Sequence, residues 1–192
     1  PRSKRCPHTG RVRIPVIMVD FQDQPFKLSK DVFASYYNGT EAHEYSTETL
    51  YDGYSSVRRF FYDASHGNFD PQFDLYGVYR LKHNHDYYGD KYGRLDEVFS
   101  EAISLANQDI DFSQYDSNND GNVDLLYILY AGTSANNSAY GDEDNDIWPS
   151  CSYGLNYRAD GKAINIIGVS NELTARAADS PTGKDIRAGI GV

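Results

Sequence analysis

The sequence is poor in cysteine, tryptophan and methionine, and acidic residues outnumber basic ones. Its 192 residues include two Cys, one Trp and one Met, and 28 Asp and Glu stand against 18 Lys and Arg, for a net charge of -10. Two cysteines, Cys6 and Cys151, are too few for a disulfide framework, so they form one bridge or none. The shortage of basic residues argues against nucleic acid as a partner, because phosphate binding depends on clustered Lys and Arg.

The sequence also has no apolar run of about 18 residues, the length that a membrane span needs. Its first residues lack the zones of a signal peptide, but a trimmed secreted chain would begin in the same way. Hydrophobic residues still make up 40% of the chain and aromatic residues 14%, which is enough for a buried core. We therefore predict one globular domain over residues 1–192, with residues 1–11 as a basic N-terminal tail.

Hydrophobic periodicity predicts strands alternating with helices. Apolar runs predict strands at residues 12–21, 125–130 and 163–169, and spaced apolar residues predict one strand or an extended pair at residues 69–78. Helical spacing of apolar residues predicts short helices that begin at Ser29 and at Ser55 or Ser56, and a longer helix over residues 95–110. The small, polar and acidic segment from Thr133 to Asp146 predicts a mobile loop. This order favours an α/β (α+β) fold with a mixed, twisted sheet and flanking helices.

The sharpest motif is a loop rich in Asp and Asn, D-x-N-x-D-G-x-x-D, directly before the apolar strand at 125–130. Calcium takes six to eight oxygen ligands at about 2.3–2.6 Å, and short side chains on alternate residues of a tight loop supply them. Gly121 permits the sharp turn, after which a backbone carbonyl points inward. We predict one structural calcium ion, held by Asp116, Asn118, Asp120, Asp124 and the carbonyl of Asn122.

The same residues allow two other interpretations of this loop. An EF-hand needs a bidentate Glu at its twelfth position, where this chain has Tyr127, so an EF-hand is disfavoured. A polar turn without an ion stays open, since short motifs of this kind arise by chance. Three carboxylates held close together repel one another without a cation, and this repulsion favours calcium.

The spacing of the histidines predicts no catalytic zinc site. Such a site uses His at positions i and i+4 of one helix with a Glu as the base. His43-Glu44 begins this motif, but Thr47 stands where the second His is needed. His83 and His85, with an acidic partner such as Asp86, leave open a hydrolase of another kind. The sequence has no nucleophile elbow, glycine-rich phosphate loop or CxxC motif.

Several segments, in order along the chain, together resemble the M6 peptidase family, the family of immune inhibitor A. They are residues 13–26, 56–81, 111–132, 146–150 and the later SNEL at 170–173. The resemblance implies the N-terminal half of a zincin-like metallopeptidase domain, truncated at Val192, ahead of a helix that bears HExxH. It implies a secreted zinc-dependent endopeptidase for peptide or protein substrates, with zinc ligands and catalytic Glu outside this chain, so that the chain alone is inactive.

The resemblance also implies a position for the substrate. In zincin-type folds the strand before the catalytic helix lies along the bound peptide, which corresponds here to Lys162–Ser170. Ile164, Ile166 and Gly168 are then expected on the edge that faces the substrate. An ordinary sheet edge is the alternative.

A second hypothesis comes from a different class of protein. The same calcium loop fits an extracellular binding or adhesion module that is stabilised by calcium and has no catalysis. Residues encoded after Val192 would separate the two hypotheses, because an HExxH motif on a helix supports only the peptidase.

Overall fold

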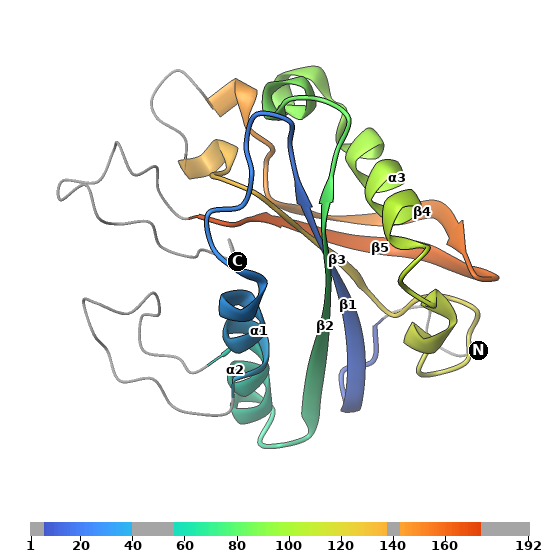
Figure 1. The fold of residues 1–192 in the computed structure, drawn as a ribbon. Helices are drawn as coiled ribbons and strands as arrows, with labels where there is room; N and C mark the ends of the chain where they lie inside the picture. Colours follow the sequence, from blue (N-terminus) through green and yellow to red (C-terminus); the bar gives the residue numbers. More distant parts are fainter. Residues whose placement is uncertain (1–5, 40–55, 138–142, 174–192) are drawn as a thin grey trace, which may run out of the picture.

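The computed structural model of the protein describes residues 6–39, 56–137 and 143–173. A five-stranded sheet in the order β2-β1-β3-β5-β4 forms its centre (Figure 1). The strands are β1 (Gly10–Asp20), β2 (Phe69–Arg80), β3 (Leu126–Tyr130), β4 (Ser150–Ala159) and β5 (Lys162–Asn171). The α-helices are α1 (Lys30–Asn38), α2 (Val57–Ala64) and α3 (Leu95–Ala106), and the 3-10 helices are η1 (His85–Tyr88), η2 (Asp90–Tyr92), η3 (Phe112–Tyr115), η4 (Ala135–Asn137) and η5 (Glu143–Asn145).

The sheet is mixed, as predicted. β1 pairs in parallel with β2 and with β3, and β3 pairs in parallel with β5. β4 pairs with β5 in the antiparallel direction. The α/β class with a mixed sheet and flanking helices is confirmed.

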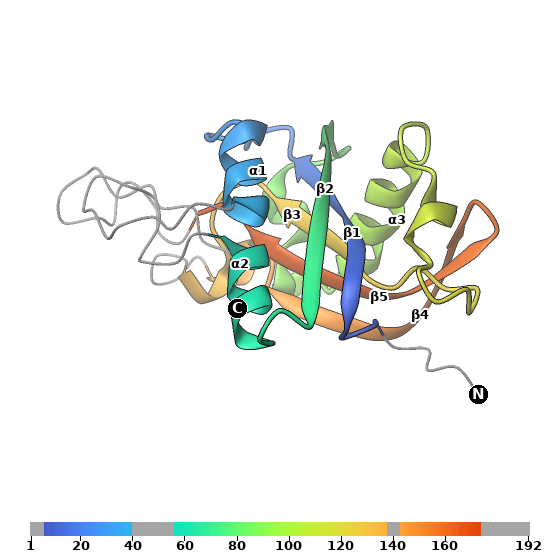
Figure 2. The same ribbon diagram turned by 90° about the horizontal axis from the view of Figure 1, so that it is seen from below.

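The helices cover the two faces of the sheet unequally. α1 and α2 lie on one face and α3 on the other (Figures 1 and 2). Alternate residues of β1 point to opposite faces, so Ile17 and Val19 belong to the core under α3, whereas Val16 and Met18 belong to the core under α1. Because residues 14–19 of β1 are buried on both sides, this part of the strand is a continuous apolar run.

All three predicted helices form, but the apolar face of α2 is less buried than its sequence pattern suggests. Ser56 caps α2, since its Oγ accepts a hydrogen bond from Arg59 N–H at 2.9 Å. The predicted pattern of Val57, Phe60, Phe61 and Ala64 has helical spacing, but no residue of α2 is buried. Val57 packs, partly buried, against the core under α1, whereas Phe60 and Phe61 are 45% and 42% exposed. The apolar face of this helix therefore covers the core only in part. α3 has the predicted face, with Val98, Phe99, Ala102, Ile103 and Ala106 buried, and it ends before residue 110.

Three other expectations need correction. β4 was not predicted, because its residues alternate irregularly and most of them are exposed. The supposed mobile loop from Thr133 to Asp146 includes buried Thr133, Ser134 and Asp146 within the described part of the chain. The N-terminal tail, predicted to reach residue 11, ends earlier because β1 begins at Gly10.

Candidate functional site

The predicted calcium loop connects η3 to β3 and folds back on itself around Asp116. Asp116 Oδ1 accepts a hydrogen bond from Asp120 N–H, and its Oδ2 accepts one from Gly121 N–H, each at 2.9 Å. Asn119 and Gly121 have positive φ values of 56° and 89°, which let the chain turn sharply here. The Asp116 side chain is fully buried as a result.

The other predicted ligands line the same loop. Asn118 Oδ1 accepts a hydrogen bond from Asp120 N–H, and Asp120 Oδ1 accepts one from Asn122 N–H, each at 2.9 Å. Asp124 Oδ2 accepts one from Ser117 N–H at 3.1 Å. The structure therefore brings all five predicted residues into one compact turn.

A lysine already supplies positive charge to this turn. Lys162, at the start of β5, donates a hydrogen bond from its Nζ to Asp116 Oδ2 at 2.7 Å. Burial works to raise the pKa of Asp116, but Lys162 and the loop amides outweigh burial, so the pKa is lowered. For Asp124 the balance is reversed, since burial raises its pKa and the carboxylates of Asp116 and Asp120 add to the rise. One lysine thus leaves part of the negative charge in the loop uncompensated.

The loop fits calcium in composition but not in its present arrangement. Among residues 6–39, 56–137 and 143–173, no three His, Cys, Asp or Glu side chains converge closely enough to hold a metal ion. Asp120 Oδ2 accepts no hydrogen bond from any described residue, so this oxygen remains for a cation. Calcium would have to draw it inward and would compete with Ser117 for Asp124 and with the Lys162 ammonium for Asp116.

The loop is also joined to β5 through the backbone. Ala163 N–H donates to Gly121 O at 3.0 Å, and Val123 N–H donates to Ala163 O at 2.8 Å. Val123 itself is buried in the core under α3. Any ion bound in the loop would therefore stabilise the start of both β3 and β5.

The predicted substrate edge is wrong. β5, which contains Ile164, Ile166 and Gly168, pairs with β3 on one side and with β4 on the other. On one side Ile167–Asn171 pair with β3 and Ala163 bridges to Asn122, and on the other side β4 pairs along the strand. The ring of Tyr127 lies 2.7 Å from the position that a Cβ on Gly168 would occupy. An extended peptide cannot add to an interior strand. Within the described sheet, the outer strands are β2 and β4.

At the other end of β5, the buried side chain of Glu172 joins three segments. Its Oε1 accepts hydrogen bonds from Lys27 N–H at 2.6 Å and Leu28 N–H at 2.7 Å, and its Oε2 accepts one from Gly132 N–H at 2.9 Å. Burial raises the pKa of Glu172, although these donors favour the ionised form. In the sequence, Glu172 stands out only as part of the SNEL segment of the resemblance, and no pattern there predicts its role.

The histidine pair does not act as a unit. His85 Nδ1 lies 2.7 Å from Asp23 Oδ2, and its Nε2 lies 3.8 Å from Asp146 Oδ1. The ring of His83 stacks on Tyr87 with centroids 4.0 Å apart. His85 thus pairs with carboxylates from two other loops and not with the suggested Asp86. The partial HExxH motif at His43 and Thr47 lies outside the described residues.

Both cysteines are free thiols in the structure. Cys6 packs against the core under α1, and burial raises the pKa of its thiol to about 11. Cys151 is exposed on β4. Of the two possibilities left open by the sequence, the structure has no bridge.

The chain matches no family model, and no curated protein matches it in sequence. The M6 resemblance therefore remains a prediction that rests on the segments quoted above. No helix within the described residues is long and apolar enough to cross a membrane.

Proposed function

We propose that the chain is the scaffold half of a secreted, zinc-dependent endopeptidase with a zincin-like fold. Its zinc ligands and catalytic Glu would come from residues outside this chain, and zinc would activate the water that attacks the peptide bond. The described residues would supply the sheet that supports this site.

One observation carries the proposal: the segments that resemble the M6 family meet at one end of the sheet. Glu172, in the SNEL segment, binds Lys27 and Leu28 directly after the first segment and Gly132 at the end of the third. The backbone N–H of Leu81, the last residue of the second segment, donates to Asp20 O in the first at 2.9 Å. Segments that lie together in space support a common site more strongly than a scattered likeness does.

A structural calcium ion in the Asp116–Asp124 loop belongs to the same proposal. The support is the number of oxygen side chains in one turn, where three carboxylates, those of Asp116, Asp120 and Asp124, share a single lysine partner at Asp116. The ion would stabilise the loop and take no part in catalysis.

A peptide substrate would add to β4 rather than to β5. Within the described sheet β4 is an outer strand, so one side of its backbone is available for strand addition. Its register shifts between Tyr153 and Tyr157, which leaves two regular stretches, Ser150–Tyr153 and the shorter Tyr157–Ala159. The longer stretch, Ser150–Tyr153, is the one proposed to pair with the peptide. A short extended peptide matches this length.

The proposal can be tested by comparing this chain with a version extended by the residues encoded after Val192. We expect the extended protein to hold stoichiometric zinc and to cleave casein until a chelator removes the metal, and the 192-residue chain to do neither. An extension without zinc or cleavage would refute the peptidase and leave the calcium-stabilised binding module as the better account.

A further inference from the structure

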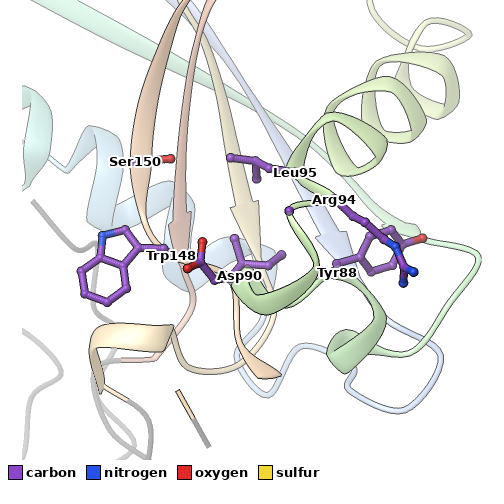
Figure 3. Close-up of a pocket in the computed structure, with 8 residues that line it drawn as sticks. Tyr88, Asp90, Arg94, Leu95, Trp148 and Ser150 are labelled. Carbon is purple, nitrogen blue, oxygen red and sulfur yellow. The ribbon is translucent and has the colours of Figure 1, made fainter. Parts of the chain in front are cut away.

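A pocket of about 370 Å³ lies between η1, η2, the start of α3 and the segment that leads into β4 (Figure 3). Its lining combines apolar and polar side chains. The apolar ones are Tyr88, Leu95, Ile147 and Trp148, and the polar ones include Asp90 and Ser150. Trp148 is 52% exposed, so part of its indole remains open to a ligand.

Hydrogen bonds of the buried backbone hold the walls of this pocket in place. Ile147 O accepts hydrogen bonds from Tyr130 Oη at 2.7 Å and from Ala135 N–H at 3.1 Å. Asp90 N–H donates to Asp146 O at 3.0 Å, which joins η2 to the same segment. Gly89 packs so closely there that an added Cβ would lie 2.6 Å from Asp144 O. The pocket is therefore formed without a ligand.

The pocket has negative charge and an aromatic wall. Asp90 is the only acidic residue in its lining, and no described residue forms an ion pair with that carboxylate or donates a hydrogen bond to it. The Arg94 guanidinium, although Arg94 lines the pocket, is turned away (Figure 3) and lies 3.8 Å from the ring centroid of Tyr87. It also donates to Tyr87 O at 3.0 Å. The charge of Arg94 is thus used outside the pocket.

The pocket adjoins β4, an outer strand of the described sheet. Ser150 lines the pocket and begins β4, where it lies opposite Val169 of β5. Residues opposite each other in neighbouring strands share a face of the sheet, and Val169 belongs to the core under α3. A peptide paired with Ser150–Tyr153 would therefore pass the pocket and direct alternate side chains toward the α3 face.

We infer that the pocket binds the Lys or Arg side chain of an extended peptide that pairs with β4. The aliphatic stem packs on Leu95 and Ile147, and the cationic group lies between the Asp90 carboxylate and the face of Trp148. Such a contact gives the Asp90 carboxylate an ion-pair partner, which none of the described residues supplies. The inference rests on the proposed function for the peptide substrate, and it adds a preference for basic side chains.

The test uses Trp148 as its probe, because it is the only tryptophan of the chain. Capped alanine pentapeptides with a central Lys, norleucine or Glu are titrated into the chain while tryptophan fluorescence is recorded. We expect the Lys peptide to change the fluorescence at the lowest concentration, because norleucine lacks the charge and Glu is repelled. Asp90→Asn should weaken binding of the Lys peptide about fivefold, the effect of an exposed ion pair of about 1 kcal/mol.

Asp144→Asn is the matched control, since it removes one negative charge from an exposed neighbouring position outside the pocket. It should leave the affinity for the Lys peptide unchanged. Equal affinity for the Lys and norleucine peptides, an unchanged affinity in Asp90→Asn, or no binding of any peptide would each overturn the inference. Zinc-dependent cleavage by the extended protein alongside such a result would leave the proposed function intact, so the two can fail separately.

Discussion

Two buried acidic side chains lie near opposite ends of β5 and are neutralised in different ways. Asp116 pairs with the ammonium group of Lys162 at the start of the strand, whereas Glu172, just past its end, accepts hydrogen bonds from three backbone N–H groups. A lysine side chain can move and be replaced by an ion. Backbone amides cannot, so the first site is suited to exchange a cation and the second is a fixed structural joint.

The largest expected effect concerns the fixed joint. Glu172→Ala leaves the amides of Lys27, Leu28 and Gly132 without their acceptor, and we expect unfolding in urea to show a loss of about 3–5 kcal/mol. Glu172→Gln keeps one carbonyl oxygen as acceptor and should lose less. A loss below about 1 kcal/mol in the alanine variant would mean that these hydrogen bonds do not hold the segments together.

The next effect concerns the exchangeable cation. In the presence of a chelator, Lys162→Met removes the partner of a buried carboxylate and should cost about 2–3 kcal/mol. Excess calcium should restore most of this loss, because the ion then supplies the missing charge. The control is Lys91→Met, which changes an exposed lysine on η2 and should shift the stability by less than about 0.5 kcal/mol. If calcium restores no stability to Lys162→Met, a cation does not replace the lysine at Asp116, and the contrast with Glu172 fails.

The smallest effect is on the pH dependence of stability. Burial raises the pKa of Glu172, so the folded state favours the protonated carboxyl group. The contribution of Glu172 to stability is therefore largest below the pKa of Glu in the unfolded chain, about 4.3. It falls as pH rises through the higher pKa of the folded state. The free-energy difference between the parent and Glu172→Gln should therefore shift in favour of the parent as the solution is acidified.

The pH dependence of stability expected from Asp70 runs in the opposite direction. Hydrogen bonds from Arg58, and the charges of Arg58 and Arg11, hold the pKa of Asp70 below its usual value. Asp70 therefore stabilises the folded state above about pH 4, and this stabilisation is lost as pH falls through the lowered pKa of the folded state. Asp70→Asn should therefore approach the parent in stability on acidification. Urea unfolding at several pH values measures both trends, and equal trends in the two variants would contradict these assignments.

The sequence predicted β1, β2, β3 and β5 but not β4. β1 and β3 have apolar patterns because each is buried against other elements, and both form where expected. α3 begins at the expected residue and has the expected buried face, but it ends at Ala106, before the predicted Ile110. β4 was missed because an outer strand, with Tyr153 72% exposed, has no need for apolar alternation. The position of β5 between two strands could not be predicted, since strand order depends on contacts between distant segments.

The candidate site was predictable only where its residues are neighbours in the chain. The loop from Asp116 to Asp124 is one short motif, so its side chains were bound to lie close together. Lys162 and Glu172 were not foreseen, because their partners lie far away in sequence and neither residue stands in a motif with a known role. The pocket beside Trp148 is likewise formed by distant segments.

Calorimetric titration of calcium into chelator-treated protein tests the exchangeable site most directly. We expect one calcium ion per chain, and a gain of about 2.7 kcal/mol in stability when the ion is present at about 100 times its dissociation constant. Asp120→Ala should lose most of both effects, because Asp120 offers an oxygen that accepts no hydrogen bond from any described residue. No heat of binding, together with equal melting temperatures for the parent and Asp120→Ala with and without calcium, would show that the loop is a polar turn neutralised by Lys162 alone.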